Sequence, residues 1–240
     1  MIRFQRLQTI GRQIVREEER FVSTSSCRNK SFRKMYQEFW TPQPITKPPY
    51  GHFTQVGDPV LRRKAAEVPE DQIHSKEVNY IIEQMLYVLK KFDCVGVAAP
   101  QIGISLRIIV MEFREELKDK FSKVVCEARK MSTLPLTVLI NPTMTVTNYE
   151  KHKHPEGCMC VRGYSAEVER YNSVLISGKD QSGSDKKFKL SGWNARIAQH
   201  EMDHLDGKLY IDRMDPSTFT CTIWETVNAK SGRVEIPFYK

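Results

Sequence analysis

The sequence Q-H-E-M-D-H-L-D-G occupies residues 199–207 and completes the last long helical pattern of the chain. On a helix, His200 and His204 lie one turn apart on the same face, so their imidazoles can converge on one metal ion. Glu201 is rotated by about 100° from His200, near enough to contact a metal-bound water without binding the metal itself. The pattern favours a metal-dependent hydrolase. The alternative is a solvated helix face that carries two surface histidines.

A catalytic metal site needs three protein ligands and an open position, so the third ligand decides the class of hydrolase. Zinc proteases with the extended H-E-x-x-H-x-x-G-x-x-H motif carry a third His six residues after the second, where this chain has Tyr210. A thermolysin-like protease takes a Glu from a later helix, and neither Glu225 nor Glu235 lies in such a helical pattern. A generic zinc endopeptidase is therefore disfavoured.

The segment E-G-C-M-C, residues 156–160, offers a different third ligand. Gly157 is expected to form a tight turn that points Cys158 inward, and a thiolate is a strong ligand for a borderline metal ion. A Cys beside a Gly is also a common small core residue, and this segment alone leaves that alternative open. Cys160 places a second thiol two residues from Cys158. We expect it to be buried, and oxidation together with Cys158 is the alternative.

The pattern of apolar residues predicts an α+β fold. Residues spaced at i, i+3, i+4, i+7, i+8 and i+11 predict a helix over Lys76–Lys91: Val78, Ile81, Ile82, Met85, Leu86 and Leu89. Strands are predicted at 106–113 and at 137–140, the latter ending at Asn141-Pro142, and a hairpin at 174–177 and 188–190. A helix follows from Ser191 and ends near Gly207. Because strands precede and flank this late helix rather than alternate with helices, α+β is the better class.

Charge and composition exclude several classes of function. The chain has a formal net charge of +8, but residues 1–50 hold ten Lys or Arg and only four acidic residues, so the remainder is nearly neutral. A nucleic-acid surface needs bases clustered on the folded domain, and none is expected here. No apolar run approaches the roughly 18 residues of a membrane span, so no membrane insertion is expected. The six cysteines lack the spacing of a disulfide framework and are expected to be reduced thiols.

The N-terminus has the composition of a targeting sequence. Residues 1–16 contain four Arg and no acidic residue, and their pattern is that of a basic amphipathic helix. We interpret residues 1–22 as a mitochondrial transit peptide, with a basic tail as the alternative, although Glu17–Glu19 is unusual in a presequence. Residues 23–50, rich in Pro, are expected to be a linker or N-terminal arm, 51–220 the catalytic domain and 221–240 a C-terminal tail.

Three segments together resemble the signatures of one enzyme family. They are C-V-G-V-A-A-P-Q-I-G at 94–103, E-G-C-M-C at 156–160 and the H-E-M-D-H motif. They are similar to G-x-G-x-A-A-P-Q-x-G, E-G-C-L-S and H-E-x-D-H of the peptide deformylase family, and the resemblance covers about residues 52–220. With its leader, the chain looks most like the animal mitochondrial type. Cys94 replaces the first Gly of the first signature, at a cost of about 1–2 kcal/mol if that position needs a positive φ.

The resemblance implies a fold of antiparallel or mixed sheets around a late helix that carries the H-E-x-x-H motif. It also implies the removal of the formyl group from formyl-methionine at the N-terminus of newly made chains. Carried over by position, Cys158, His200 and His204 bind the metal and Glu201 moves the protons. The oxyanion would be stabilised by the side-chain amide of Gln101 and the backbone N–H of Met159.

Further implications concern the surroundings of the site. Gly96 lies where the substrate backbone of the family pairs like an added strand. Glu156 is expected to pair with Arg170 and to hold the loop that carries the ligand Cys. One divalent ion is implied, with Fe2+ favoured and Zn2+ or Co2+ as alternatives. The expected partners are formyl-methionyl nascent peptides and the mitochondrial ribosome, and the expected location is the mitochondrial matrix. A non-catalytic or weakly active member of the family is the alternative.

Overall fold

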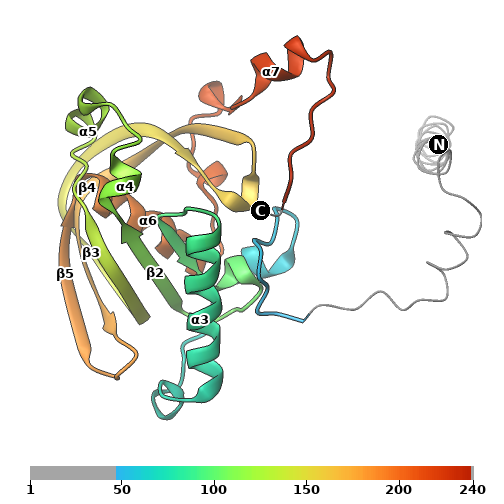
Figure 1. Cartoon of the computed structure of the whole chain (residues 1–240). Coiled ribbons are helices and arrows are strands. Elements are labelled where there is room, and N and C mark those ends of the chain that lie inside the picture. The colour runs from blue at the N-terminus through green and yellow to red at the C-terminus, as the bar shows by residue number, and fades with distance from the viewer. Residues whose placement is uncertain (1–46, 239–240) are drawn as a thin grey trace, which may run out of the picture. The chain divides into compact units, whose positions relative to one another are not determined.

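Two long antiparallel strands, β3 (Leu134–Gly157) and β4 (Tyr164–Lys179), dominate the fold (Figure 1). The structure is a computed structural model and describes residues 47–238, so the predicted transit peptide and most of the predicted linker lie outside the described residues. Within this part, β1 (Gly96–Ala98), β2 (Ile108–Phe113) and β5 (Asp185–Ser191) complete an antiparallel sheet in the order β1-β2-β3-β4-β5. The short strand β6 (Thr220–Cys221) pairs with β4. The predicted α+β class is confirmed.

The predicted end of a strand at Asn141-Pro142 is wrong, because β3 continues past it to Gly157. The pairing with β4 shifts register between Ile140 and Thr143, and Asn141 has a left-handed φ of 52°. A bulge of this kind accommodates a residue that cannot donate to the ladder, such as Pro142. The Asn141 side chain holds the bend, since it accepts from the Val68 N–H and donates to the Val68 carbonyl, each at 2.8 Å. His152 and His154 lie within this continuation of β3, opposite Arg170 and Val168.

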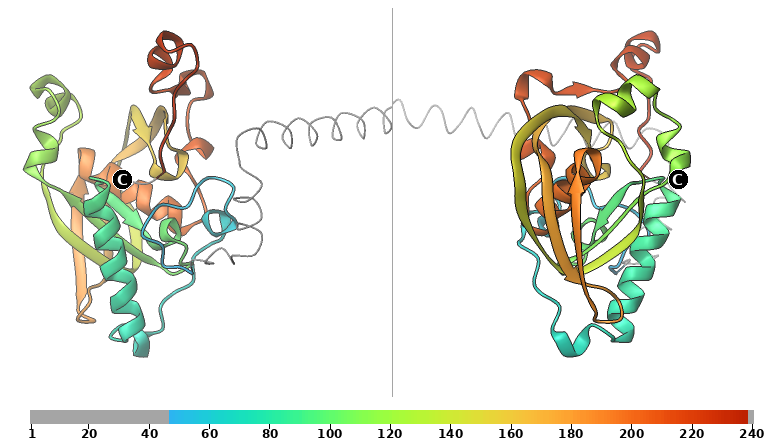
Figure 2. Two further views of the ribbon diagram at one scale, coloured as in Figure 1. Left: turned by 45° about the vertical axis from the view of Figure 1, so that its right-hand side comes forward. Right: turned by 90° about the vertical axis from the view of Figure 1, so that its left-hand side faces the viewer.

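Helix α6 (Gly192–Leu205) is enclosed by the curved sheet and contacts β1, β2, β4 and β5 (Figure 2). Gln199 joins it to β4, since its Nε2 donates to the Tyr171 carbonyl at 2.8 Å and its Oε1 accepts from the Tyr171 N–H at 3.0 Å. The helix begins at Gly192, which has a φ of 56°, and is followed by Gly207, which has a φ of 71°. A Cβ at Gly207 would lie 2.7 Å from the Arg62 carbonyl oxygen, so the predicted end near Gly207 depends on glycine.

Helix α3 (Lys76–Lys91) has the predicted bounds. Ser75 caps it by accepting a hydrogen bond from the Val78 N–H at 3.1 Å. Its apolar stripe packs beside β1 and β2 in a core cluster that also includes Leu61, Ile102 and Tyr210. A second cluster, around Phe113, Leu139 and Ala198, fills the space between the sheet and α6. The two clusters fix α6 relative to the strands that precede it.

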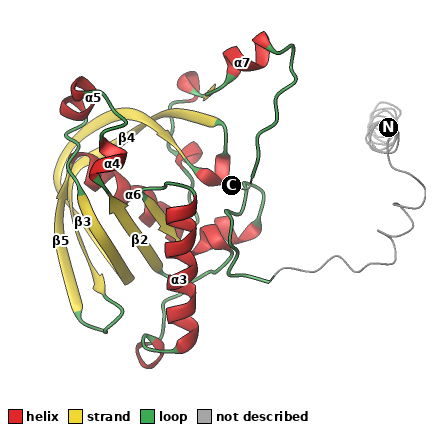
Figure 3. Cartoon of the chain, viewed as in Figure 1, coloured by secondary structure: helices red, strands yellow, loops and turns green. Residues whose placement is uncertain are grey.

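The remaining elements are short (Figure 3). The charged segment 114–134 contains α4 (Glu115–Lys118) and α5 (Lys123–Ala128). The described residues also form six short 3-10 helices: η1 (Pro59–Arg62), η2 (Glu70–Gln72), η3 (Ala99–Ile102), η4 (Met159–Val161), η5 (Tyr210–Asp212) and η6 (Pro216–Thr218). Helix α7 (Trp224–Ala229) lies in the C-terminal segment, and its first residue, Trp224, is 53% exposed. No helix within residues 47–238 has both the length and the apolar character needed to cross a bilayer.

Candidate metal centre

Cys158, His200 and His204, the three residues proposed as ligands from the sequence, come together in the structure. Their ligand atoms all lie within 4.8 Å of one another, and the Cys158 Sγ is 3.3 Å from His204 Nε2. A tetrahedral ion with one sulfur and two nitrogen ligands requires these atoms to be roughly 3.5 Å apart. The two histidines project from consecutive turns of α6, with ring centroids 5.0 Å apart. The donor set and its spacing therefore fit one divalent ion.

Cys158 is placed by the turn between β3 and β4. It precedes η4 in an extended conformation, with a φ of −139°, and its sulfur accepts a hydrogen bond from the Cys160 N–H at 3.5 Å. The predicted tight turn at Gly157 is wrong, since Gly157 ends β3 opposite Ser165 and the left-handed glycine is Gly163, with a φ of 89°. A hydrogen bond from the Cys160 thiol, together with the charge of the neighbouring histidines and against the effect of burial, holds the pKa of Cys158 well below its ordinary value. Cys158 is therefore suited to act as a thiolate ligand.

Glu156 orients His200, because its Oε2 lies 3.1 Å from His200 Nδ1 and leaves Nε2 directed toward the ligand thiolate. The same carboxylate accepts hydrogen bonds from Arg170 Nε and Nη2, each at 3.0 Å, and from Arg196 Nη1 at 2.6 Å. Although burial opposes ionisation, hydrogen bonds from His200 and Arg170 hold the pKa of Glu156 well below its usual range. The structure thus brings Glu156 and Arg170 together.

Two residues of this network were missed from the sequence. Asp203 accepts a hydrogen bond from Arg170 Nη1 and forms an ion pair with Arg213 Nε at 2.8 Å. Arg196 lies one turn before His200 on α6 and bonds to Glu156 and to the Val168 carbonyl. The i−4 spacing of Arg196 from His200, and the Asp inside the H-E-M-D-H motif, were the available signals.

Glu201 is 3% exposed, and its Oε2 is buried without a hydrogen-bond partner among the described residues. Burial raises the pKa of this carboxyl to about 7, against the charges of His200 and His204. Gly96 makes room for it, since a Cβ at that position would lie 2.3 Å from Glu201 Oε1. An unpaired buried carboxylate beside three ligand atoms is consistent with a site completed by an ion and water.

Gln101 lies in η3, is 2% exposed and points its amide nitrogen at the two thiols. Its Oε1 accepts from the Ala98 N–H at 2.7 Å, which directs Nε2 to within 3.6 Å of both Cys158 Sγ and Cys160 Sγ. Cys160 is fully buried, as expected. Met159 opens η4, and its carbonyl accepts from Gln55 Nε2 at 3.0 Å. Gln55 was not identified from the sequence, because its contact with η4 joins segments that are 104 residues apart.

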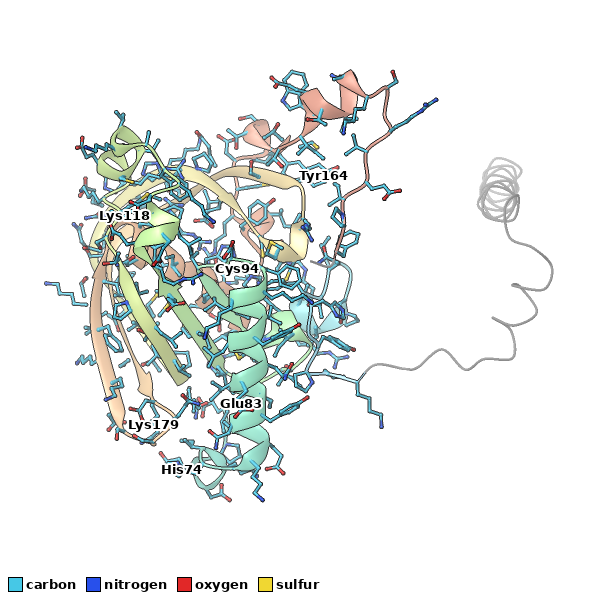
Figure 4. The ribbon with its side chains drawn as sticks, viewed as in Figure 1. His74, Glu83, Cys94, Lys118, Tyr164 and Lys179 are labelled. Atoms are coloured by element: carbon cyan, nitrogen blue, oxygen red, sulfur yellow. The ribbon has the colours of Figure 1, made fainter. Side chains whose placement is uncertain are left out.

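A cleft of about 390 Å³ leads to these residues. Its walls are mainly apolar and include Phe53, Phe92, Met159, Tyr164 and Ile197, while His200 and Glu201 also line it. Figure 4 labels Cys94, just after α3, and Tyr164, at the start of β4, and both residues line the cleft. The positive φ near the first signature falls on Asp93, at 54°, so Cys94 occupies its position without that strain.

Residues 51–219 match the family model described as polypeptide deformylase. Human peptide deformylase, mitochondrial, is 41% identical over 182 residues, which cover 76% of this chain and 75% of that protein. Peptide deformylase 1A, chloroplastic/mitochondrial, from Arabidopsis thaliana is 44% identical over 163 residues, which cover 68% of this chain and 61% of that protein.

Solved structures of peptide deformylases are also similar to this chain. The peptide deformylase from Synechococcus elongatus in complex with actinonin has a TM-score of 0.58 and 34% identity, covering 79% of this chain and 92% of that one. A Met-Ala-Ser-bound class I type b peptide deformylase from Acinetobacter baumannii has a TM-score of 0.60 and 27% identity, covering 68% of this chain and 96% of that one.

The late helix inside a curved antiparallel sheet, with a Cys-His-His cluster beside a buried Glu, defines a metal-dependent hydrolase. More specifically, this chain belongs to the polypeptide deformylase family. Members of this family remove the N-formyl group from nascent peptides. The predicted family, fold class and enzyme class are confirmed.

Proposed function

We propose that this enzyme deformylates formyl-methionyl nascent peptides with one divalent ion held by Cys158, His200 and His204. The observation that carries the proposal is the convergence of one sulfur and two imidazole nitrogens beside Glu201, whose buried Oε2 has no hydrogen-bond partner among residues 47–238. When bound, a divalent ion supplies Lewis acidity that makes hydroxide available from water near neutral pH. The donor set suits Fe2+, Zn2+ or Co2+, and Fe2+ is proposed by analogy with the family.

Glu201 is proposed to carry the protons. Its carboxylate lies next to the ligand atoms and is excluded from bulk water, so it can accept a proton from the attacking water and deliver it to the leaving amine. Gly96 keeps this path open because any side chain there would collide with the carboxylate.

The oxyanion that forms from the formyl oxygen needs donors that are already in place. The Gln101 amide is fixed by the Ala98 N–H, and we assign it as one donor, with the Met159 backbone N–H as the other. Strand β1 lies at the edge of the sheet, where Gly96 is proposed to pair with the substrate backbone as an added strand.

Glu156 and Arg170 are proposed to hold the ligand geometry rather than to contact the substrate. Glu156 fixes the ring of His200, and Arg170 ties Glu156 to Asp203 on α6. Buried charges therefore join the strands that flank the ligand Cys158 to the helix that carries His200 and His204.

The mitochondrial and chloroplastic relatives support a location in the mitochondrion. We place the enzyme in the matrix, with transit peptide 1–22, arm 23–50, catalytic domain 51–220 and tail 221–240, where newly made chains leave the mitochondrial ribosome.

The proposal is tested with the full chain purified without oxygen, its bound metal measured and formate release assayed on formyl-Met-Ala-Ser. We expect about one ion per chain and formate release that stops when a chelator removes the ion. Metal binding without formate release would instead indicate a non-catalytic member of the family.

A further inference from the structure

Arg162 lines the cleft that leads to Glu201 and has no assigned role in the reaction. It lies four residues after Cys158, at the end of η4. Its Nη1 is buried and lacks a hydrogen-bond partner, and no ion pair is found for its guanidinium within residues 47–238. A buried guanidinium nitrogen without an acceptor is costly, so a partner from outside the chain would be bound favourably.

Two other charged side chains that line the cleft, Arg196 and Asp93, already have partners. Arg196 is paired with Glu156 at 2.6 Å. Asp93 lies 3.5 Å from both Arg114 and Lys120. Among the described residues that line the cleft, Arg162 is thus the cation that lacks a counter-charge, and an anionic group entering the cleft would meet it.

The backbone around Arg162 is held firmly. The preceding Val161 N–H donates to the Cys158 carbonyl at 3.0 Å, and the following Gly163 carbonyl accepts from the Thr222 N–H at 2.9 Å and from Thr222 Oγ1 at 3.1 Å. Tyr164 pairs with Cys221, and its ring stacks on Phe219 with centroids 5.1 Å apart. Arg162 is therefore presented from a fixed turn between the ligand Cys158 and the aromatic rim of the cleft.

We propose that Arg162 binds a carboxylate side chain of the substrate, so that the enzyme favours nascent chains with Asp or Glu shortly after formyl-methionine. This inference rests on the proposed deformylation. Arg162 and Glu201 line the same cleft, so a peptide whose formyl end reaches Glu201 can bring a residue that follows methionine to Arg162. The planar guanidinium can bind a carboxylate through two hydrogen bonds. A neutral amide lacks the negative charge that strengthens this contact.

The test compares formyl-Met-Xaa-Ala and formyl-Met-Ala-Xaa, where Xaa is Glu, Gln or Lys, using the metal-loaded full chain. The wild type, Arg162→Gln and Arg162→Lys are measured for kcat and KM by formate release. Arg63→Gln is the matched control, because Arg63 is exposed and does not line the cleft.

For the wild type we expect kcat/KM to be about tenfold higher with Glu than with Gln at one of the two positions, mainly through KM. Arg162→Gln should bring this ratio close to one, Arg162→Lys should keep part of it, and Arg63→Gln should keep all of it. Formyl-Met-Ala-Ala, which is neutral, reports deformylation itself and separates a failure of this inference from a failure of the proposed function. If Arg162→Gln does not fold, the ratio for Arg162→Lys decides. Equal rates for Glu and Gln in the wild type, or a ratio unchanged in the Arg162 variants, would overturn the proposal.

Discussion

The carboxylate of Glu156 lies 3.1 Å from Nδ1 of His200. Glu156 precedes the proposed ligand Cys158 by two positions, and it orients a second proposed ligand, His200, which follows Cys158 by 42 positions. This contact joins the end of β3 to helix α6. It makes the position of the imidazole depend on a side chain that does not itself bind the ion.

Replacing Glu156 by Gln is expected to weaken both metal binding and folding. Arg170 and Arg196 would lose their buried counter-charge, which we expect to cost about 3–5 kcal/mol of unfolding free energy. Metal affinity should fall by about 10–100-fold. Urea unfolding and metal titration measure the two effects. Glu150→Gln, at an exposed position of the same strand, should change neither. A Glu156→Gln variant with unchanged metal affinity would contradict the orienting role.

Replacing Glu201 by Gln should leave the ion bound and reduce formate release by about 10²–10⁴-fold or more, because the amide cannot accept the proton of the attacking water. Metal content and single-turnover formate release are measured on the same preparation. Near-normal turnover with full metal occupancy would remove Glu201 from its proposed role.

Replacing Gly96 by Ala should reduce activity through Glu201. The added Cβ would lie 2.3 Å from Glu201 Oε1, which must move away. Gly51→Ala is the matched control, since its Cβ would meet only a Tyr87 ring carbon at an ordinary 3.5 Å. We expect a large drop in kcat for Gly96→Ala, with bound metal retained, and wild-type kinetics for Gly51→Ala. Equal activity of the two variants would show that this clearance is unimportant.

Replacing Cys158 by Ala should abolish stoichiometric metal binding, since only two of the three proposed ligands remain. Cys221→Ala removes a thiol from β6, outside the proposed ligand set, and should keep the ion. Elemental analysis of both variants decides the point. Because an ion that binds only the native state stabilises it, a chelator should lower the Tm of the Cys221→Ala variant and leave that of Cys158→Ala unchanged.

The leader prediction concerns residues outside the described part of the chain. Residues 1–30 fused to a fluorescent protein should direct it to mitochondria, because the segment is basic and amphipathic and has no acidic residue before Glu17. Changing Arg3, Arg6 and Arg12 to Gln should weaken import. A diffuse cytosolic signal from the unchanged fusion would contradict a transit peptide.

Local patterns predicted those parts of the fold that local physics determines. The stripe from Val78 to Leu89 specified α3 because a helix of that length buries one face. The spacing of His200 and His204 indicated a shared site because residues four positions apart on a helix lie on the same face. In contrast, the course of β3 beyond Pro142 depends on a bulge that the side chain of Asn141 fixes against Val68, and that contact spans 73 positions of the chain.

The candidate site likewise contains residues that local sequence patterns predicted and residues that only the folded structure brought to light. The segments around Cys158 and His200 were found from their sequences, and the pairing of Glu156 with Arg170 was implied by the resemblance to the family. The roles of Asp203 and Arg196 could not be deduced from spacing alone, because each contacts a residue of another element through the folded sheet. Gly96 was assigned to the substrate, and its contact with Glu201 became visible only once α6 and β1 were placed side by side.

The glycines at the two ends of α6 have a consequence for how the ligand set can change during evolution. Each helical residue turns the chain by 100°, so a single insertion between Gly192 and His200 would swing both imidazoles away from the sulfur. Gly192 and Gly207, both in left-handed conformations, lie close against Lys130 and Arg62, so a rotation of the helix would bring its ends into collision with these neighbours. We therefore expect length changes in related enzymes to be confined to the strands and connecting segments, with the fourteen residues of α6 constant.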